Sequence, residues 1–454
     1  MPVHDIDPRQ FLDTLFRDTI AALQPFRAVH AALDALDNRL DGAAARSAAP
    51  TTRVHLIGTG KAAVSMTQAA LEWCTNHDVQ PAGGVVITHH MPVSLPPSIR
   101  LCIGDHPVPD AHSQAAARQL GEYIDSEVHT CDSVLLLLSG GTSALLGAPR
   151  TGLDAQVYRE LCATLLTSGL VIGDLNLLRR RLSRWSGGRL GAALQARGAT
   201  VQVLAMSDVI GDSLAAIGSG PCVPDRSTDA EIEAVVQRAT LDTTDRTVLR
   251  QALRDVARDA TPAAGRYIPH RVVSSSIVAQ MDVHVQAALR GAFVSGMQPL
   301  LRGEAEVEGE AIAHALMRLA VTAPAPESER AAPRHICCWG GEPTVALPMR
   351  DVPPGGRMQA LALAVARTLA AFPTAAAGIT VLAAGSDGRD GTTDAAGAIV
   401  DRDTWAAIVR AGRDPAADLA AHRSHDALRA AGVLLPAFVS GINVNDLVIG
   451  CVTR

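Results

Sequence analysis

Short apolar runs that end in polar, glycine-rich loops recur along the first half of the chain. Four such runs are predicted strands, at residues 54–57, 84–88, 133–138 and 201–206. Between them lie segments whose apolar residues recur at helical spacing. Continuous apolar runs that alternate with helices are typical of parallel strands buried on both faces. The first half of the sequence therefore predicts an open, Rossmann-like parallel α/β sheet.

The pattern changes after a polar and helical stretch at residues 225–265. Strand-like runs resume at residues 271–275, 294–301, 335–339 and 379–383, and helical segments such as 309–321 and 356–371 separate them. We expect a Rossmann-like domain over residues 1–265 and a second, smaller α/β domain over residues 266–454.

Composition excludes several classes of partner. The 454 residues are 48% hydrophobic and carry a net charge of −6, so the chain has ample core and no basic field for a phosphate backbone. Six Phe, four Trp and three Tyr residues leave little surface for stacking on bases. The apolar runs are far shorter than a membrane span, and the N-terminus lacks the pattern of a signal peptide. We expect neither a nucleic-acid nor a membrane partner.

The eight cysteines are scattered, and none forms a CxxC pair. Most lie in apolar stretches, which favours buried free thiols over disulfides or a metal site. Free thiols predict a reducing compartment, and we expect the protein to be cytoplasmic.

Lysine is almost absent from the chain. Of its 40 lysine and arginine residues, only Lys61 is a lysine. We infer that this lysine lies where a guanidinium does not fit or function. Lys61 follows a predicted strand and Gly58-Thr-Gly60, a spacing that matches neither a Walker A nor a GxGxxG motif. We predict that Lys61 reaches a phosphate or a carboxylate. The alternative is an exposed lysine at a helix start.

Two further glycine loops extend this reading. Ser139-Gly-Gly-Thr-Ser143 follows a predicted strand and has the composition of a phosphate cradle, although a tight turn with a hydroxyl cap explains it too. Ser186-Gly-Gly188 is a weaker version of it. The predicted phosphate or nucleotide ligands are Gly58, Gly60, Ser139, Gly140, Gly141, Thr142, Ser143 and Gly188.

Carboxylates and one arginine complete the candidate site. Asp208 lies where a strand ends, and Asp387 lies in a glycine-rich loop that also contains Asp390 and Asp394. We predict Asp208 and Asp387 as Mg²⁺ ligands, and turn or helix-cap roles are the alternative. Arg357 follows two glycines at a helix start and suits bidentate contact with a phosphate. Candidate bases such as His106 lack a recognised catalytic signature, so a structural role is favoured for them.

Taken together, these loops suit an anionic, phosphorylated ligand. The residues favour a kinase or another phosphate-dependent enzyme. A dinucleotide-dependent oxidoreductase is the second interpretation, and a sugar-phosphate sensor without catalysis is the third. A GxGxxG fingerprint at the first strand-to-helix turn would favour the oxidoreductase, and the chain does not have one there.

The ordered set of motifs resembles the glycerate 2-kinase family of the type that carries a MOFRL domain. The matching segments span nearly the whole chain: residues 57–63, 106–110, 139–145, 207–212, 218–221, 309–311, 340–345, 355–357, 385–397 and 443–447. Two stretches depart from the family pattern. Met358 and Ala360 stand where the family has an amide and a carboxylate beside the arginine, and residues 181–188 lack its histidine and lysine.

The resemblance implies a specific reaction. It implies a kinase that uses ATP and Mg²⁺ to phosphorylate D-glycerate to 2-phosphoglycerate, with a cleft between a Rossmann-like domain and a MOFRL domain. It also implies that Lys61 and Arg357 are the catalytic residues. Some members carry the name hydroxypyruvate reductase, which keeps an NAD(P)H-dependent reductase, or a kinase for a related hydroxy acid, as the alternative. The oligomeric state stays open, with a homodimer as one option.

Overall fold

The computed structural model describes residues 6–44, 53–89, 95–257, 266–322, 334–347 and 353–453. The chain forms two compact units, which we name after their sheets. The parallel-sheet unit is Pro25–Val273, and the mixed-sheet unit combines Met1–Gln24 with Ser274–Arg454. No helix in the described ranges is both long and apolar enough to cross a membrane.

The parallel-sheet unit is built on six strands in the order β3-β2-β1-β4-β5-β6. Their bounds are β1 Val54–Thr59, β2 Pro81–Thr88, β3 Ile99–Ile103, β4 Ser133–Leu138, β5 Thr200–Met206 and β6 His270–Ser274. Neighbours from β3 to β5 pair in parallel. The four predicted strands are present, and the predicted open parallel sheet is confirmed.

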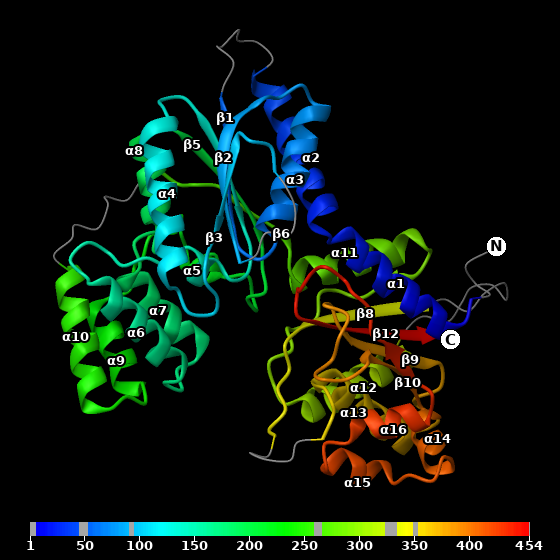
Figure 1. Cartoon of the computed structure of the whole chain (residues 1–454). Helices are drawn as coiled ribbons and strands as arrows, with labels where there is room; N and C mark the ends of the chain where they lie inside the picture. Colours follow the sequence, from blue (N-terminus) through cyan, green and yellow to red (C-terminus); the bar gives the residue numbers. More distant parts are fainter. Residues whose placement is uncertain are drawn as a thin grey trace. The chain divides into compact units, whose positions relative to one another are not determined.

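Helices cover both faces of this sheet (Figure 1). Helices α2 (Pro25–Ala44) and α3 (Ala63–Asn76) lie on one face, and α4 (Ala111–Glu127) and α8 (Arg189–Ala196) lie on the other. Buried side chains of α4 and α8 share one apolar core with β1, β2, β4 and β5. This double cover explains why the strands read as continuous apolar runs.

A helical subdomain lies beside the sheet in the same unit. It comprises α6 (Ala155–Leu166), α7 (Ile172–Leu182), α9 (Asp229–Arg238) and α10 (Thr243–Ala257). These helices bury an apolar core of their own, which includes Tyr158, Leu178 and Leu249. The short α5 (Thr142–Leu145) and the 3₁₀ turn η2 (Ile217–Ser219) connect the subdomain to the loops at the strand ends.

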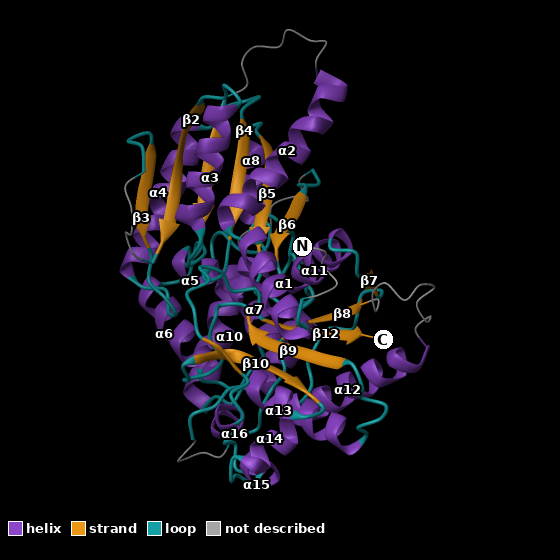
Figure 2. Cartoon of the chain, turned by 90° about the vertical axis from the view of Figure 1, so that its right-hand side faces the viewer, coloured by secondary structure: helices purple, strands orange, loops and turns teal. Residues whose placement is uncertain are grey.

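The mixed-sheet unit contains a second six-stranded sheet in the order β11-β10-β9-β12-β8-β7 (Figure 2). Its bounds are β7 Phe293–Val294, β8 Arg334–Gly341, β9 Ile379–Gly385, β10 Ala395–Asp401, β11 Leu434–Pro436 and β12 Asp446–Thr453. All pairings are antiparallel except that of β7 with β8. Strands β10, β11 and β12 go beyond the predicted ones, and of the run predicted at residues 294–301 only Val294 lies in one of the six strands, β7. Strand β10 was missed because its run of Ala and Gly has low strand propensity.

Two sets of helices belong to the mixed-sheet unit. One set packs its core on the sheet: α12 (Ala305–Thr322), α13 (Arg357–Ala371), α14 (Thr404–Arg410), α15 (Pro415–Ala420) and α16 (Ser424–Ala430). The other set is α1 (Pro8–Ala22) and α11 (Ser276–Leu289), which contact each other and the same sheet.

The division into units differs from the expected boundary at residues 265 and 266. Helix α1 belongs to the mixed-sheet unit because it buries its apolar face there, where the Phe16 and Phe438 rings meet edge to face at 6.1 Å. Its Arg9 also pairs with Asp401 of β10 at 2.5 Å. Conversely, the strand expected to open the second domain is β6, the edge strand of the parallel sheet. The N–H of Val203 in β5 donates to the Pro269 carbonyl just before β6.

Candidate active site

Two glycine loops meet where β1 and β4 end side by side. The Lys61 N–H donates to the Gly140 carbonyl at 2.9 Å, and the Ala62 N–H donates to the Ser139 hydroxyl at 3.0 Å. Gly60 has φ +122°, and a Cβ there would lie 2.2 Å from the Ser139 oxygen, so only glycine fits this crossing. The structure thus brings Gly58–Lys61 and Ser139–Ser143 together, as parallel neighbouring strands require.

The hydroxyl groups of the second loop have partners inside the protein. The Thr142 hydroxyl lies 2.9 Å from the Thr59 carbonyl and 2.8 Å from the Ser139 carbonyl, so it ties β1 to β4. The Ser143 hydroxyl lies 2.8 Å from that of Ser219, which donates to the Asn176 amide oxygen at 3.2 Å. Ser219 and Asn176 therefore join the site. Ser219 lies within a motif used for the family resemblance, whereas Asn176 gave no local signal.

The Lys61 side chain is exposed and lies against Gly141 and His106. A Cβ on Gly141 would lie 3.4 Å from Lys61 Cγ and 3.3 Å from His106 Cδ2. Burial and the charges of Lys61, His89 and Arg179 lower the pKa of His106, which favours its neutral form. Lys61 and Arg179 thus place positive charge beside this loop, which suits an anionic ligand. Arg179, on α7, was not predicted because an arginine within a basic helix end carries no distinguishing signal.

Asp208 contacts the same loops from the end of β5. Its carboxylate is exposed, and a Cβ on Gly140 would lie 2.6 Å from its Oδ2, so glycine is needed for this approach. Among the described residues no group of three His, Cys, Asp or Glu side chains could hold a metal ion. One carboxylate beside a phosphate cradle nevertheless fits Mg²⁺, which commonly binds through one or two carboxylates, phosphate oxygens and water.

Gly188 lies on a wall that the site shares with the segment 217–221. Its N–H donates to the Gly220 carbonyl at 2.8 Å, and the neighbouring Gly187 N–H donates to the Ser219 carbonyl at 3.0 Å. Gly188 has φ +85°, and a Cβ there would lie 2.8 Å from Pro224 Cα, so the close approach requires glycine. Gly188 thus contacts Gly220, and its neighbour Gly187 contacts Ser219, whose hydroxyl meets that of Ser143.

In the mixed-sheet unit, Arg357 is the first residue of α13 and is held by two carboxylates. Its Nη1 lies 2.8 Å from Glu342, and its Nε lies 2.5 Å from Asp446 at the start of β12. Burial opposes the charge of Arg357, but Asp446 and Glu342 outweigh it and raise the pKa of Arg357. Burial also raises the pKa of Asp446 to about 7, although Arg357 opposes that rise. Glu342 and Asp446 were not predicted as site residues, although both lie within segments that match the family pattern.

The predicted carboxylates of the 385–397 loop have distinct environments. Asp390 is buried and accepts the N–H groups of Met358 and Gln359 at 3.1 and 2.7 Å, so it caps α13 beside Arg357. A Cβ on Gly356 would lie 2.1 Å from the Asp390 carboxyl carbon. Asp387 is exposed and accepts the Arg389 N–H at 2.9 Å. Asp390 is thus a helix cap, whereas the Asp387 carboxylate faces solvent.

The two family departures beside Arg357 differ in burial. Met358 is fully buried in the core of the mixed-sheet unit, and Ala360 is partly buried against that core. The thioether therefore replaces an amide inside the core rather than on an exposed surface.

Comparison with known proteins supports the resemblance over the whole chain. A profile described as a domain of unknown function (DUF4147) matches residues 11–254, and the MOFRL family matches residues 335–446. A D-glycerate 2-kinase from Thermotoga maritima is 33% identical, with 96% of this chain and 97% of the relative covered. This chain belongs to the glycerate 2-kinase family of the MOFRL type.

Other members of the glycerate 2-kinase family have different names. A glycerate 2-kinase from Pyrococcus horikoshii is 29% identical, covering 99% of this chain and 98% of the relative. A provisionally named hydroxypyruvate reductase from Agrobacterium vitis is 33% identical over 98% of this chain and 95% of the relative. The crystal structure of a glycerate kinase from Thermotoga maritima has a TM-score of 0.79 and 31% identity, with 98% of this chain and 99% of that chain covered.

Proposed function

We propose that this protein transfers the γ-phosphoryl group of ATP to D-glycerate and releases 2-phosphoglycerate and ADP. One observation carries the proposal: the only lysine of the chain is anchored by its backbone where two strand-end glycine loops cross. Relatives named as glycerate 2-kinases, matched over nearly their full length, support the choice of reaction.

We assign Lys61 to the negative charge of the transferring phosphoryl group. Phosphoryl transfer passes through a loose transition state, so positioning and charge neutralisation matter more than covalent catalysis. We also propose Arg357 as a catalytic residue. Glu342 and Asp446 hold its Nη1 and Nε and thereby fix the plane of its guanidinium. The remaining edge of the guanidinium then contacts an oxygen atom of the substrate.

The glycine loops hold the nucleotide phosphates directly, and the carboxylates hold them through Mg²⁺. Gly58, Gly60 and the Ser139–Ser143 loop place main-chain groups beside Lys61. We assign Mg²⁺ first to Asp208, and Asp387 is the other candidate ligand. Bound Mg²⁺ supplies neutralisation of the phosphate charge. We also propose that the enzyme works in the cytoplasm, since all eight cysteines are free thiols.

One assay tests this function. The protein is incubated with D-glycerate, ATP and Mg²⁺, and enolase without phosphoglycerate mutase reports 2-phosphoglycerate as an absorbance rise at about 240 nm. We expect signal with D-glycerate, none without it, and a rate at least about a hundredfold lower with Lys61→Met. A product that needs the mutase would be the 3-phosphate and would overturn the assigned regiochemistry.

Hydroxypyruvate reduction is the second candidate, because a relative of equal identity bears that name. At the first strand-to-helix turn, Ala63 stands where a dinucleotide fingerprint has its third glycine, and it is fully buried. Oxidation of NADH or NADPH in the presence of hydroxypyruvate, followed at about 340 nm, would favour the reductase. We expect no oxidation above the rate without enzyme.

A further inference from the structure

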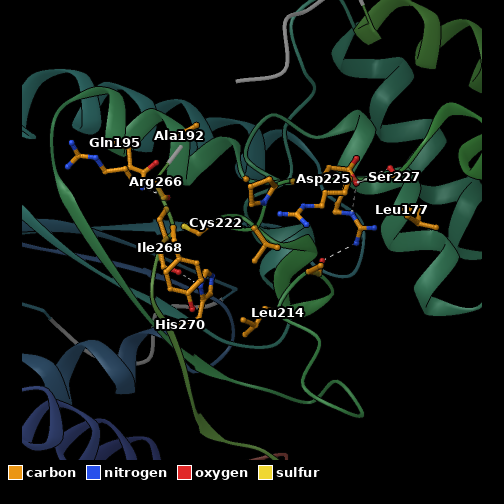
Figure 3. Close-up of a pocket in the computed structure, with 18 of the residues that line it drawn as sticks. Leu177, Ala192, Gln195, Leu214, Cys222, Asp225, Ser227, Arg266, Ile268 and His270 are labelled. Carbon is orange, nitrogen blue, oxygen red and sulfur yellow. Dashed lines mark hydrogen bonds and ion pairs between the residues drawn. The ribbon is translucent and has the colours of Figure 1, made fainter. Parts of the chain in front are cut away.

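A cavity lies in the parallel-sheet unit, and its lining does not include Lys61, Asp208 or the Ser139–Ser143 loop. Its volume is about 730 Å³, within the usual range for sites of small organic ligands. Figure 3 shows Gln195, Ile268 and His270 on one side and Leu177, Asp225 and Ser227 on the other, with other lining residues such as Leu214 between them.

The cavity and the cradle of Lys61 flank the same short segment of chain. On the cavity side, Gly187 and Gly188 donate their N–H groups to the carbonyls of Ser219 and Gly220. On the cradle side, the Ser219 hydroxyl meets that of Ser143 at 2.8 Å. A ligand that fills the cavity therefore lies next to the phosphate loops.

The lining combines apolar surface with an available aromatic ring. Leu177, Leu214 and Ile268 contribute aliphatic side chains, and Tyr267 is 83% exposed at the edge. An exposed tyrosine beside an apolar pocket is a platform on which a planar ring can stack. The shape and composition thus suit a flat, partly apolar group rather than a small acid.

Charges in the cavity leave it positive at its edge. Asp225 is already paired with Arg180 at 3.3 Å and with Arg181 at 3.1 Å. The Glu231 carboxylate accepts the Thr228 N–H in a capping box, so it too is occupied. Arg226 and Arg266 line the cavity and are exposed. These guanidinium groups at the edge therefore suit a ligand whose charged end leaves the cavity.

Two side chains present hydrogen-bond acceptors. Burial lowers the pKa of His270, and its Nδ1 lies 2.8 Å from the Ile268 carbonyl, so Nδ1 carries the proton and Nε2 accepts. The Gln195 amide nitrogen donates to the Arg266 carbonyl at 2.7 Å, which leaves its oxygen as an acceptor. Two acceptors suit the exocyclic amino group of adenine, whereas guanine has a carbonyl at that position.

We propose that this cavity binds the adenosine part of ATP, with the base stacked on Tyr267 and the triphosphate directed around the 217–221 segment to the Lys61 cradle. The assignment rests on the proposed kinase function, because it identifies the nucleotide subsite of that reaction. It also gives a role to Gly188, predicted as a nucleotide-binding residue, since its backbone lines the cavity.

Calorimetry of MgADP binding to the full chain tests the assignment without turnover. Tyr267→Ala should weaken binding about tenfold, whereas Tyr267→Phe should bind as the wild type does, because the ring is kept. Ala192→Phe, which fills the cavity from α8, should weaken binding further. Arg226→Ala should weaken it severalfold, and Arg118→Ala, an equally exposed arginine on α4, should not. MgGDP should bind more weakly than MgADP.

Steady-state kinetics provide the second measurement. In Tyr267→Ala the KM for ATP should rise about tenfold while the KM for D-glycerate stays within twofold. Wild-type affinity for MgADP in both Tyr267→Ala and Ala192→Phe would overturn the cavity assignment, even if D-glycerate is phosphorylated. If the wild type binds MgADP in a Tyr267-dependent way but phosphorylates no D-glycerate, the cavity assignment stands and the proposed function falls.

Discussion

The role of Lys61 can be tested by removing its charge and keeping its shape. Lys61→Met retains the apolar stem that lies along Gly141, at 3.4 and 3.5 Å from the position of a Cβ there, and deletes only the ammonium group. The backbone bond from the residue 61 N–H to the Gly140 carbonyl does not depend on the side chain. Because the side chain is exposed, we expect the melting temperature to change by less than about 2 °C.

The size of the expected effect follows from electrostatics. Two unit charges about 4 Å apart interact by about 4 kcal/mol at an effective dielectric constant of about 20. If that interaction is made with the transferring phosphoryl group, its loss lowers kcat/KM by about a thousandfold. Arg179, whose charge also acts on His106, partly compensates for the lost ammonium group. We therefore expect kcat/KM to fall between about a hundredfold and a thousandfold.

The enolase-coupled assay measures this loss, and circular dichroism confirms that the variant is folded. Lys61→Arg is the matched control, since it restores the charge with a planar and wider group. We expect it to recover less than about a tenth of wild-type activity, because His106 and Gly141 pack closely beside the lysine stem. Near wild-type turnover in Lys61→Met would refute the catalytic role, and full activity in Lys61→Arg would mean that the lysine is retained for another reason.

Three further changes test packing, capping and ion pairing in the two units. Phe16→Ala removes a fully buried ring and should cost about 3–5 kcal/mol. Hydrogen exchange should then lose protection in β8, β9 and β12 rather than in β1 to β5, where a loss would contradict the assignment of α1. Gly356→Ala should lower the unfolding free energy by about 2 kcal/mol, measured by urea denaturation, because its Cβ displaces the Asp390 cap; an unchanged midpoint would show that the loop adapts. Burial opposes the charge of Asp132, but the His129 N–H and His55 outweigh it and lower the pKa of Asp132. The ionised carboxylate therefore stabilises the fold at a pH above the pKa that Asp132 has in the unfolded chain. This stabilisation is lost as the pH falls through the pKa that Asp132 has in the folded protein. Asp132→Asn should therefore cost about 1–3 kcal/mol near pH 7, and its gap to the wild type in urea denaturation should shrink in acid; a gap independent of pH would exclude this linkage.

Much of the candidate site in the parallel-sheet unit was accessible from local patterns. The sequence pattern placed Lys61 and the Ser139 loop at strand ends, and the structure shows that these two strands, β1 and β4, are neighbours whose loops are joined by hydrogen bonds. The composition could not show that the Ser139 and Thr142 hydroxyls would be used to join the loops to each other. Hydroxyl partners depend on backbone positions that are set only when the strands pair.

The surroundings of Arg357 were much less accessible. Glu342 and Asp446 are 15 and 89 residues away from it, and no periodicity connects them. Antiparallel pairing of β12 with β8 brings Asp446 opposite Gly341, next to Glu342 in sequence. The ion pairs of Arg357 thus follow from strand register.

By itself, the sequence determined the parallel α/β class, the strand-end loops, the presence of a single lysine and the family. Each of these can be recognised from residue types and their spacing within short segments. The tertiary structure alone decided that α1 packs in the mixed-sheet unit, that the strand after Pro269 completes the first sheet, and that a cavity lies across the 217–221 segment from the cradle. The sequence of an amphipathic helix or an edge strand shows that the element has an apolar face, but it does not show which surface covers that face. That choice depends on contacts between segments hundreds of residues apart, such as Phe16 with Phe438.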